Sequence, residues 1–352
     1  MDTLQLKPLQ LAAPDRLPEA LPTEPELPPG YLLDGRFRIA ETLGHSGMAI
    51  IYRAEDVAEG HRTVAVKVPL QKIERAPAWF ARFLREQGMG AKFDHPQLVK
   101  FLPAPPHPSR PYLVMEYLPG RTLARVLDET WPLPEAVALQ IASGVCTALR
   151  HMHGHGVVHC DLKPSNLMIG DDGTVRLFDF GLAAAPERGR HLLGSLRPIF
   201  GTPEYMAPEQ VRNGFADERA DIYSLGAILY ELLTGEVPFR RDDPWESAYA
   251  RLNGDPVAPR QLNPAISPAA EEIILHALQR KPQDRYPSVA AFQAELDAPE
   301  QVRITGYRDR LRAPRWRLSF QGTPITAGLV LGLSVVAVLV GMFFVLRFAL
   351  AR

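Results

Sequence analysis

Hydrophobic and polar positions divide the chain into a first part patterned as strands and a second part patterned as helices. Short β-branched or aromatic runs, separated by turn residues, predict strands at residues 37–43, 49–55, 63–69 and 112–117. Apolar residues then recur at helical spacing over residues 133–153, 221–234 and 268–280. Because the strands precede the helices instead of alternating with them, we expect an α+β fold with two lobes and not a doubly wound sheet.

The globular pattern runs from about residue 36 to residue 297 and follows a proline-rich stretch. Residues 1–34 hold seven prolines and hardly any aromatic residue, so no regular element extends far there. We interpret this stretch as a disordered arm. Docking of the arm into an aromatic groove of a partner is the alternative, because proline-rich segments favour the polyproline II conformation.

The most apolar segment of the chain lies near its C-terminal end. Residues 325–346 are 22 residues without a charge, and as a helix they would span about 33 Å, enough for a hydrocarbon core of about 30 Å. The segment lies at the wrong end for a secretory signal peptide. We predict a transmembrane helix there, between a basic juxtamembrane linker at 298–324 and a short tail at 347–352.

The charges that flank this segment predict its orientation. Arginines concentrate on its amino side, at positions 308, 310, 312, 315 and 317, against positions 347 and 352 on the far side. Because basic residues stay inside, we expect a single-pass protein of the inner cell membrane with its globular domain in the cytoplasm. Gly328 and Gly332 form a G-x-x-x-G pattern that could pair two such helices into a homodimer, although glycine is common in membrane helices.

Composition narrows the classes of function. Of the 352 residues, 39 are Lys or Arg and 40 are Asp or Glu, so the formal net charge is −1. Proteins that hold nucleic acid by neutralising phosphates carry an excess of basic residues, so we expect no nucleic-acid partner. The two cysteines, Cys146 and Cys160, form neither a disulfide framework nor a C-x-x-C pair, which indicates a reduced compartment.

Three short motifs carry the chemistry and follow one another in a fixed order. Residues 159–166 read H-C-D-L-K-P-S-N, residues 179–181 read D-F-G, and residues 207–209 read A-P-E. This series resembles the catalytic loop, the metal-binding loop and the A-P-E element of the protein kinase family. The resemblance covers about residues 36–297 and implies the bilobal kinase fold, with a small β-rich N-lobe and a helical C-lobe.

The resemblance assigns a role to each polar residue of these motifs. Asp161 would accept the proton of the acceptor hydroxyl, and Lys163 would lie against the γ-phosphate of ATP. Asn166 and Asp179 would hold Mg²⁺, which Mn²⁺ could replace, and Phe180 would pack to set the active arrangement. Phosphoryl transfer depends on positioning and charge neutralisation, so ATP and a divalent cation are the expected cofactors.

The upstream half of the domain agrees with this assignment. The run V-A-V-K ends at Lys67 on a predicted strand and resembles the family's lysine that pairs the α- and β-phosphates. Glu86 is the only acidic residue in the next predicted helix, within residues 79–93, and is therefore assigned as the partner of Lys67. Gly88 and Gly90 in that helix each cost about 1 kcal/mol relative to Ala, so we expect a loosely held helix whose ion pair is a control point.

The glycine-rich loop of the family is only partly matched. Residues 44–51 keep the first glycine, Gly44, but have Ser and Ala at the later glycine positions, and Gly47 could supply the missing freedom. With Leu43 and Ile51, these glycines are the expected contacts to the nucleotide. Nucleotide affinity is the property that this departure puts in question.

Residues 113–120 resemble the segment that joins the two kinase lobes. The resemblance places Ala65 and Met115 against the adenine and implies that the backbone of Glu116 and Leu118 hydrogen-bonds it. Taken alone, this segment would be read as an ordinary strand that ends in a Pro-Gly turn.

Two details favour serine and threonine over tyrosine as the acceptor. Lys163 follows Asp161 by two residues, and the run G-T-P-E-Y precedes A-P-E, both of which resemble Ser/Thr kinases. Protein substrates with Ser/Thr hydroxyls are therefore the expected partners. The resemblance also includes Asp221, and Arg285 is placed to pair with Glu209.

One departure from the family concerns control of activity. The residue after the catalytic-loop histidine is usually an arginine that requires a phosphate on the activation loop, but here it is Cys160. Between residues 181 and 207 the only hydroxyl side chains are Ser195, Thr202 and Tyr205. We therefore expect activity without activation-loop phosphorylation, controlled through membrane association or the proline-rich arm.

The chain resembles the eukaryotic-like (Hanks-type) Ser/Thr protein kinases. We interpret it as a membrane-anchored kinase of the bacterial receptor-like type that acts in signal transduction. A membrane-tethered pseudokinase scaffold is the main alternative, but a decayed scaffold has no physical reason to keep every polar residue of the motifs. A small-molecule phosphotransferase with the same lobes is disfavoured by the G-T-P-E-Y and A-P-E runs, which in the family shape a peptide platform.

Overall fold

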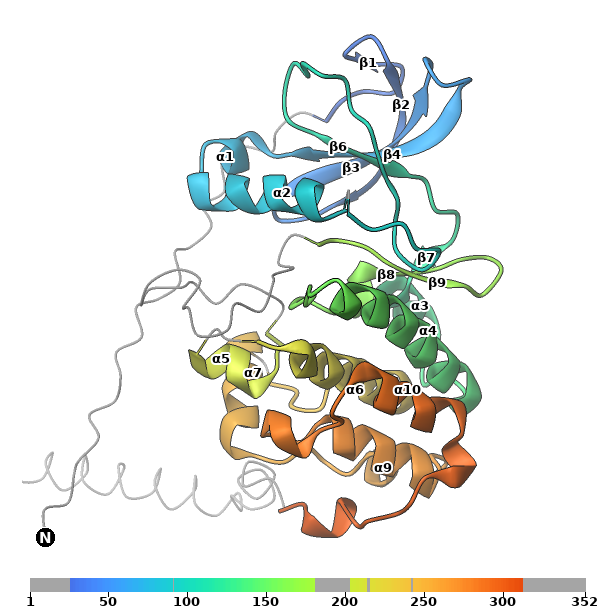
Figure 1. Ribbon diagram of the computed structural model, residues 1–352, viewed down its shortest axis with the longest axis vertical. Helices are drawn as coiled ribbons and strands as arrows, with labels where there is room; N and C mark the ends of the chain where they lie inside the picture. The colour runs from blue at the N-terminus through green and yellow to red at the C-terminus, as the bar shows by residue number, and fades with distance from the viewer. Residues whose placement is uncertain (1–25, 91, 181–202, 214–215, 242, 313–352) are drawn as a thin grey trace, which may run out of the picture.

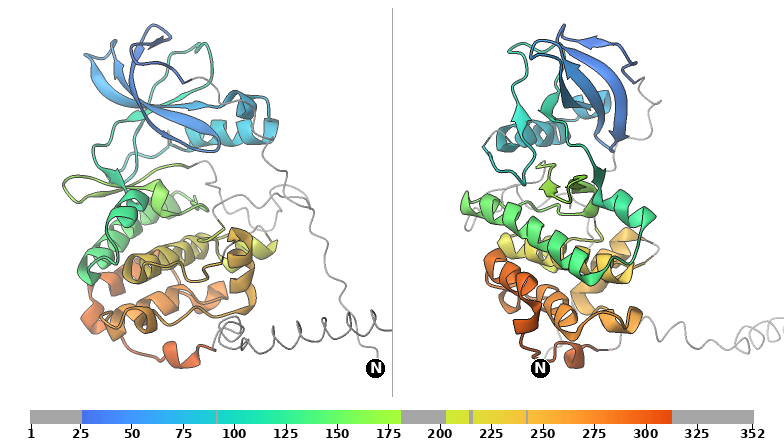
Figure 2. Two further views of the ribbon diagram at one scale, coloured as in Figure 1. Left: turned by 180° about the vertical axis from the view of Figure 1, so that it is seen from behind. Right: turned by 90° about the vertical axis from the view of Figure 1, so that its right-hand side faces the viewer.

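Two lobes of different secondary structure make up the protein (Figure 1). The computed structural model describes residues 26–90, 92–180, 203–213, 216–241 and 243–312. A twisted sheet and two helices form the N-lobe. The C-lobe consists mainly of packed helices, and the chain passes from one lobe to the other between them (Figure 2). This arrangement confirms the predicted α+β class and the bilobal fold.

The N-lobe contains a six-stranded sheet with the order β1-β2-β3-β4-β6-β5. Its strands are β1 (Leu32–Leu33), β2 (Phe37–His45), β3 (Ala49–Asp56), β4 (Arg62–Pro69), β5 (Phe101–Leu102) and β6 (Leu113–Glu116). All pairs among them are antiparallel. Its helices are α1 (Gln71–Glu74) and α2 (Pro77–Gly90), which lie along one side of the sheet.

Alternation along the strands separates the two faces of this sheet. Val64 and Val66 of β4 are buried in a cluster confined to the N-lobe, whereas Ala65 between them belongs to the larger core shared with the C-lobe. Successive side chains of a strand point to opposite faces, so Lys67 lies on the same face as Ala65. This face is the one that joins the core shared with the C-lobe.

The C-lobe is helical apart from a small three-stranded sheet with the order β7-β8-β9. These strands, which the sequence did not predict, are β7 (Arg121–Thr122), β8 (Leu167–Ile169) and β9 (Val175–Leu177). The helices are α3 (Leu123–Glu129), α4 (Glu135–Gly154), α5 (Pro208–Asn213), α6 (Glu218–Thr234), α7 (Pro244–Asn253), α8 (Pro259–Leu262), α9 (Pro268–Ala277) and α10 (Val289–Asp297). Short 3₁₀ turns are η1 (Pro164–Asn166), η2 (Pro282–Asp284), η3 (Pro299–Gln301) and η4 (Arg308–Arg310).

Helix α6 is the central element of the C-lobe, and most of its residues are buried. It begins after Asp217, whose side chain accepts a hydrogen bond from the Arg219 N–H, and this satisfies one of the free amides of the first turn. It ends at Gly235 in the left-handed conformation (φ 75°), where a Cβ would lie 1.9 Å from the Trp131 ring. Around it pack α4, α9 and α10.

The ordered structure extends beyond both predicted ends of the globular domain. At its start, Leu33 of β1 is buried and the Leu27 N–H donates to the Tyr52 hydroxyl (3.1 Å), so residues 26–34 of the predicted arm lie on the sheet. At its end, part of the predicted juxtamembrane linker packs on α9, where Glu272 accepts hydrogen bonds from the N–H and hydroxyl of Thr305 (both 2.6 Å). Contacts between residues distant in the sequence make these segments part of the domain.

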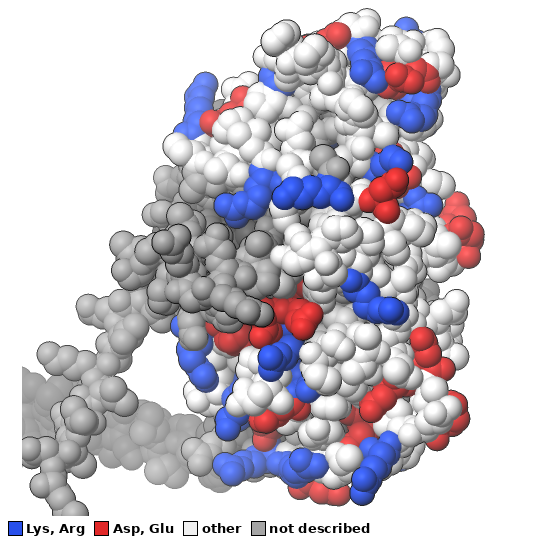
Figure 3. All heavy atoms as spheres, viewed as in Figure 1, with Lys and Arg blue, Asp and Glu red and all other residues white. Residues whose placement is uncertain are grey.

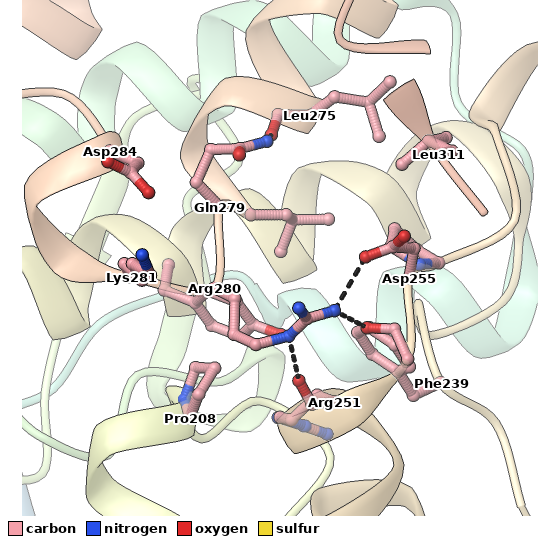
Figure 4. A pocket seen from close by; sticks show the side chains of 14 residues that line it. Pro208, Phe239, Arg251, Asp255, Leu275, Gln279, Arg280, Lys281, Asp284 and Leu311 are labelled. Atoms are coloured by element: carbon pink, nitrogen blue, oxygen red, sulfur yellow. Dashed lines mark hydrogen bonds and ion pairs between the residues drawn. The ribbon is translucent and has the colours of Figure 1, made fainter. Parts of the chain in front are cut away.

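A cavity of about 170 Å³ lies among the helices of the C-lobe (Figure 4). It is lined by Pro208 of α5, Phe239 and Arg280, together with Leu311 from the segment at 298–312, here called the C-terminal segment. The Arg280 guanidinium is bound there by Asp255 (2.7 Å). The C-terminal segment thus contributes an apolar side chain to the wall of this cavity.

Charged side chains of both signs are interspersed over the face that Figure 3 shows, in keeping with the near-zero net charge. Within the part of the chain that the structure describes, no helix has both the length and the apolar character needed to span a bilayer. The predicted span at residues 325–346, with the glycine pair at Gly328 and Gly332, lies outside the described residues.

Candidate active site

A buried ion pair joins the N-lobe sheet to α2. The Nζ of Lys67 lies 2.8 and 2.7 Å from the two carboxylate oxygens of Glu86, and both side chains are almost fully buried, with exposed fractions of 6% and 2%. Lys67 also lies 3.5 Å from Oδ1 of Asp179. A buried charge without a partner is costly, so this three-residue contact fixes the distance between sheet, helix and C-lobe.

The catalytic loop, residues 159–166, is anchored to α6 through a buried carboxylate. Asp221 accepts hydrogen bonds from the backbone N–H groups of His159 and Cys160 (both 2.9 Å), and its Oδ2 lies 2.8 Å from Nε2 of His153. Burial acts to raise the pKa of Asp221, but the hydrogen bond from His153 and the nearby histidines outweigh it and hold the pKa below its ordinary value. The anchor is therefore ionised at neutral pH.

Three side chains of this loop converge. Asp161 is buried, and its Oδ2 lies 3.2 Å from Nζ of Lys163. The Asn166 amide nitrogen donates to the Asp161 carbonyl (2.9 Å), which leaves the amide oxygen as the Asn166 atom that could take a cation. The loop therefore presents a carboxylate, an ammonium group and an amide in one place.

The segment around Asp179 is held next to the catalytic loop. The Phe178 N–H donates to the Asn166 carbonyl (3.1 Å), and Asp179 has a left-handed φ of 68°. The fully buried Phe180 ring packs against Phe93, with centroids 5.6 Å apart. Because Phe180 turns into the core, the Asp179 carboxylate is directed towards Lys67.

The residues predicted to hold adenine line the boundary between the lobes. Ala65 of β4 pairs with Met115 of β6, and both belong to the larger core cluster, against which Ile51 and Leu118 pack. Glu116 follows at the connection, where its N–H donates to the Lys100 carbonyl (2.9 Å). Ala65, Met115, Ile51 and Leu118 thus form an apolar cluster at the boundary between the lobes. Their contact with adenine stays a prediction.

The tip between β2 and β3 is closed by a serine where the family has a glycine. The Ser46 hydroxyl oxygen accepts hydrogen bonds from the N–H groups of Met48 (3.3 Å) and Ala49 (3.0 Å). A short Ser side chain that bonds local backbone in this way stabilises a tight turn. Leu43 is exposed, and a Cβ on Gly44 would meet no atom within 4 Å.

Two arginines of the C-lobe bind the segment from Glu204 to Glu209, here called the platform segment. Buried Arg251 of α7 donates to the backbone carbonyls of Glu204 (2.8 Å) and Met206. Glu209 forms a two-bond ion pair with Arg285, with both distances 2.7 Å, which confirms the predicted pairing. Predicted residues Ser195 and Thr202 and the last glycine of D-F-G lie outside the described residues.

The structure adds two residues that the sequence reasoning missed. His153 binds Asp221 from α4, and Gln210 of α5 bridges the platform segment and the catalytic loop. Neither belongs to a motif that was singled out, and their partners lie 68 and 50 residues away in the sequence. Only the packing of α4, α5 and α6 identifies them.

The donor set fits a cation that is bound together with a nucleotide. Asp179 and Asn166 offer a carboxylate and an amide oxygen, which are ligand types that Mg²⁺ accepts, and Mg²⁺ draws its other ligands from phosphates and water. Across the described ranges there is no group of three or more His, Cys, Asp or Glu side chains suited to a metal ion.

Comparison with known proteins defines the class. Residues 37–296 match the family described as "Protein kinase domain". The chain therefore belongs to the protein kinase family.

Individual relatives indicate the type of kinase. The chain is 36% identical over 299 residues to "Serine/threonine-protein kinase PknB" of Mycolicibacterium smegmatis, a match that covers 81% of this chain and 48% of that protein. It is 38% identical over 283 residues to "Serine/threonine-protein kinase Pkn1" of Myxococcus xanthus, which covers 78% and 40%. The chain thus spans less than half the length of these relatives.

Proposed function

We propose that this protein is an ATP-dependent kinase that transfers the γ-phosphoryl group to Ser or Thr hydroxyls of proteins. The observation that carries the proposal is the buried contact of Lys67 with both Glu86 and Asp179. Asp179 lies next to the catalytic loop, because the N–H of the preceding Phe178 donates to the Asn166 carbonyl (3.1 Å). The relatives that are named serine/threonine-protein kinases support the choice of acceptor.

The charge of each side chain determines its role in the proposed reaction. Bound ATP and Mg²⁺ supply the phosphoryl group and a counter-charge for the phosphates. Lys67, held by Glu86, orients the inner phosphates, and Asn166 and Asp179 hold the cation. Asp161 orients the acceptor hydroxyl and takes its proton, while Lys163 at 3.2 Å balances the charge on the γ-phosphate.

The proposal also places the protein in the inner cell membrane, as a single-pass protein with its kinase domain in the cytoplasm and a role in signal transduction. It rests on the uncharged residues 325–346 and on the arginines that precede them. A pair of such helices, through Gly328 and Gly332, would bring two kinase domains together. Cys160 in place of arginine favours control by this association and not by phosphorylation of Ser195.

The test compares variants of the full chain in detergent micelles, incubated with Mg²⁺, labelled ATP and a generic basic protein. Asp161→Asn should lower transfer at least about a hundredfold, because it removes the group that accepts the proton. Asp171→Asn, at an exposed position ten residues further on, is the matched control and should retain activity. Ser195→Ala should also retain most activity, and the full chain should sediment with membranes after cell lysis.

Each part of the proposal has its own contrary result. Equal transfer by the Asp161→Asn variant and the unchanged chain would contradict the catalytic assignment. Nucleotide binding without transfer by either chain would favour the scaffold. A chain recovered in the soluble fraction would contradict the anchor, and loss of activity in Ser195→Ala would contradict phosphorylation-independent control.

A further inference from the structure

We propose that Gln210 is a positioning residue that locks the catalytic loop to the platform segment without any phosphate. The inference rests on the proposed kinase activity and concerns how its catalytic loop is held. It starts from Cys160, the position where the family usually has an arginine that requires a phosphorylated partner.

The Gln210 side-chain amide forms two hydrogen bonds, one as a donor and one as an acceptor. Its Nε2 donates to the carbonyl of Cys160 (2.9 Å), and its Oε1 accepts from the N–H of Ala207 (2.9 Å). The residue is 7% exposed, so water competes little for either bond. One side chain therefore joins the residue before Asp161 to the residue before α5.

With the bond from Gln210, both backbone polar groups of Cys160 are hydrogen-bonded. Its N–H already donates to Asp221 of α6 (2.9 Å), so with Gln210 both its N–H and its C=O have partners in the C-lobe. Cys160 also has a left-handed φ of 66°. Residues other than glycine rarely adopt this backbone conformation unless surrounding contacts stabilise it. The peptide that leads into Asp161 is therefore fixed by α5 and α6 together.

The bond to Ala207 has a separate, purely structural use. Ala207 is the residue before α5, and Gln210 is the third residue of that helix. The Gln210 side chain therefore caps the N-terminus of α5, as in a capping box. Glutamate serves this cap equally well, because its carboxylate accepts from the same N–H and is favoured at a helix N-terminus. An ionised carboxylate cannot donate to the Cys160 carbonyl, so Gln210→Glu separates the two roles.

The experiment uses the full chain in micelles with three variants. Gln210→Glu should lower kcat about tenfold, with the KM for ATP within about twofold. It should also lower the melting temperature at neutral pH, because a buried ionised carboxylate then faces the Cys160 carbonyl. Lowering the pH towards 5 should restore part of this activity, because the protonated carboxyl of the variant can again donate to Cys160. Gln210→Met loses both bonds and should lower kcat and the melting temperature together.

Gln293→Met is the matched control for the loss of a bridging amide. Gln293 of α10 donates to Thr147 (2.9 Å) and accepts from Arg150 (3.1 Å), far from the platform segment in the sequence and on other helices. This variant should lose stability and keep kcat. Equal kcat in Gln210→Glu and the unchanged chain, at every pH, would overturn the proposal, as would an equal fall in Gln293→Met.

Amide hydrogen exchange separates this inference from the proposed function. The N–H groups of residues 159–163 should exchange faster in Gln210→Glu than in the unchanged chain, whether or not the chain transfers phosphate. Faster exchange in a chain without activity would leave the lock standing and remove the kinase proposal. Unchanged exchange would remove the lock even if transfer is observed.

Discussion

Single residues in this protein are placed by charge as much as by packing. Lys67 points into the boundary between the lobes because the strand period puts it on the same face as Ala65. It can stay there, at 6% exposure, because Glu86 and Asp179 compensate its charge. The position of the residue that would orient a nucleotide thus depends on its charged neighbours.

At this scale we predict the effect of Glu86→Gln. The variant keeps an acceptor oxygen but removes the negative charge, so Lys67 should shift towards the carboxylate of Asp179. We expect kcat/KM for ATP to fall at least about tenfold, which corresponds to about 1.4 kcal/mol. Steady-state kinetics measure this, and Arg85→Gln, at the exposed neighbouring position, should have no effect. An unchanged kcat/KM for ATP in Glu86→Gln would show that the pair is structural only.

Among the elements, α2 combines a buried functional residue with two glycines in different surroundings. A Cβ on Gly88 would meet no atom within 4 Å. A Cβ on Gly90 would lie 2.3 Å from the ring of Phe101, which itself packs on Phe180 at 5.9 Å between centroids. The sequence assigned both glycines the same cost to the helix, but the structure shows that only Gly90 is required for a close contact.

The two glycines therefore predict opposite changes in stability. Gly88→Ala should raise the free energy of unfolding by about 1 kcal/mol, because alanine has the higher helix propensity. Gly90→Ala should lower it by about 1–3 kcal/mol, because the added methyl group displaces the Phe101 ring. Denaturant unfolding of both variants measures the difference. The same sign of change in both would mean that the packing against Phe101 does not decide the outcome.

In the molecule as a whole, segments outside the predicted domain complete its surface. Glu272 of α9 is 5% exposed and is covered by Thr305, while the Tyr307 ring stacks on His276 with centroids 5.1 Å apart. Leu311 lines the cavity behind α5. The packed structure of the C-lobe therefore continues past residue 297 to at least residue 312.

This boundary predicts the stability of shortened chains. A chain that ends at Asp297 should melt several degrees lower than one that ends at Arg312. The loss follows from at least two hydrogen bonds to Glu272, at about 1 kcal/mol each, and about 2–4 °C per kcal/mol for a domain of this size. Differential scanning calorimetry of the two chains tests this. Equal melting temperatures would mean that residues 298–312 only rest on the surface.

How much the sequence predicts depends on how local the cause is. The strand at 63–69 and the helix at 221–234 were predicted within three residues of β4 and α6, because alternation and helical spacing are properties of neighbouring residues. Fixed motifs also located Lys67, Asp161 and Asp179. The strands β7, β8 and β9 were missed because they have two or three residues each and no pattern of their own.

The amino-acid sequence by itself determined the family, the order of the lobes and the polar residues of the proposed site, since these follow from local pattern and from spaced motifs. Only the tertiary structure decided that Glu86 reaches Lys67 at 2.7 Å, that Gln210 joins Cys160 to Ala207, and that residues 298–312 belong to the domain. These are contacts between buried polar groups far apart along the chain. Their partners are set by how the helices pack, because a buried donor or acceptor must find whatever group the packing brings within reach.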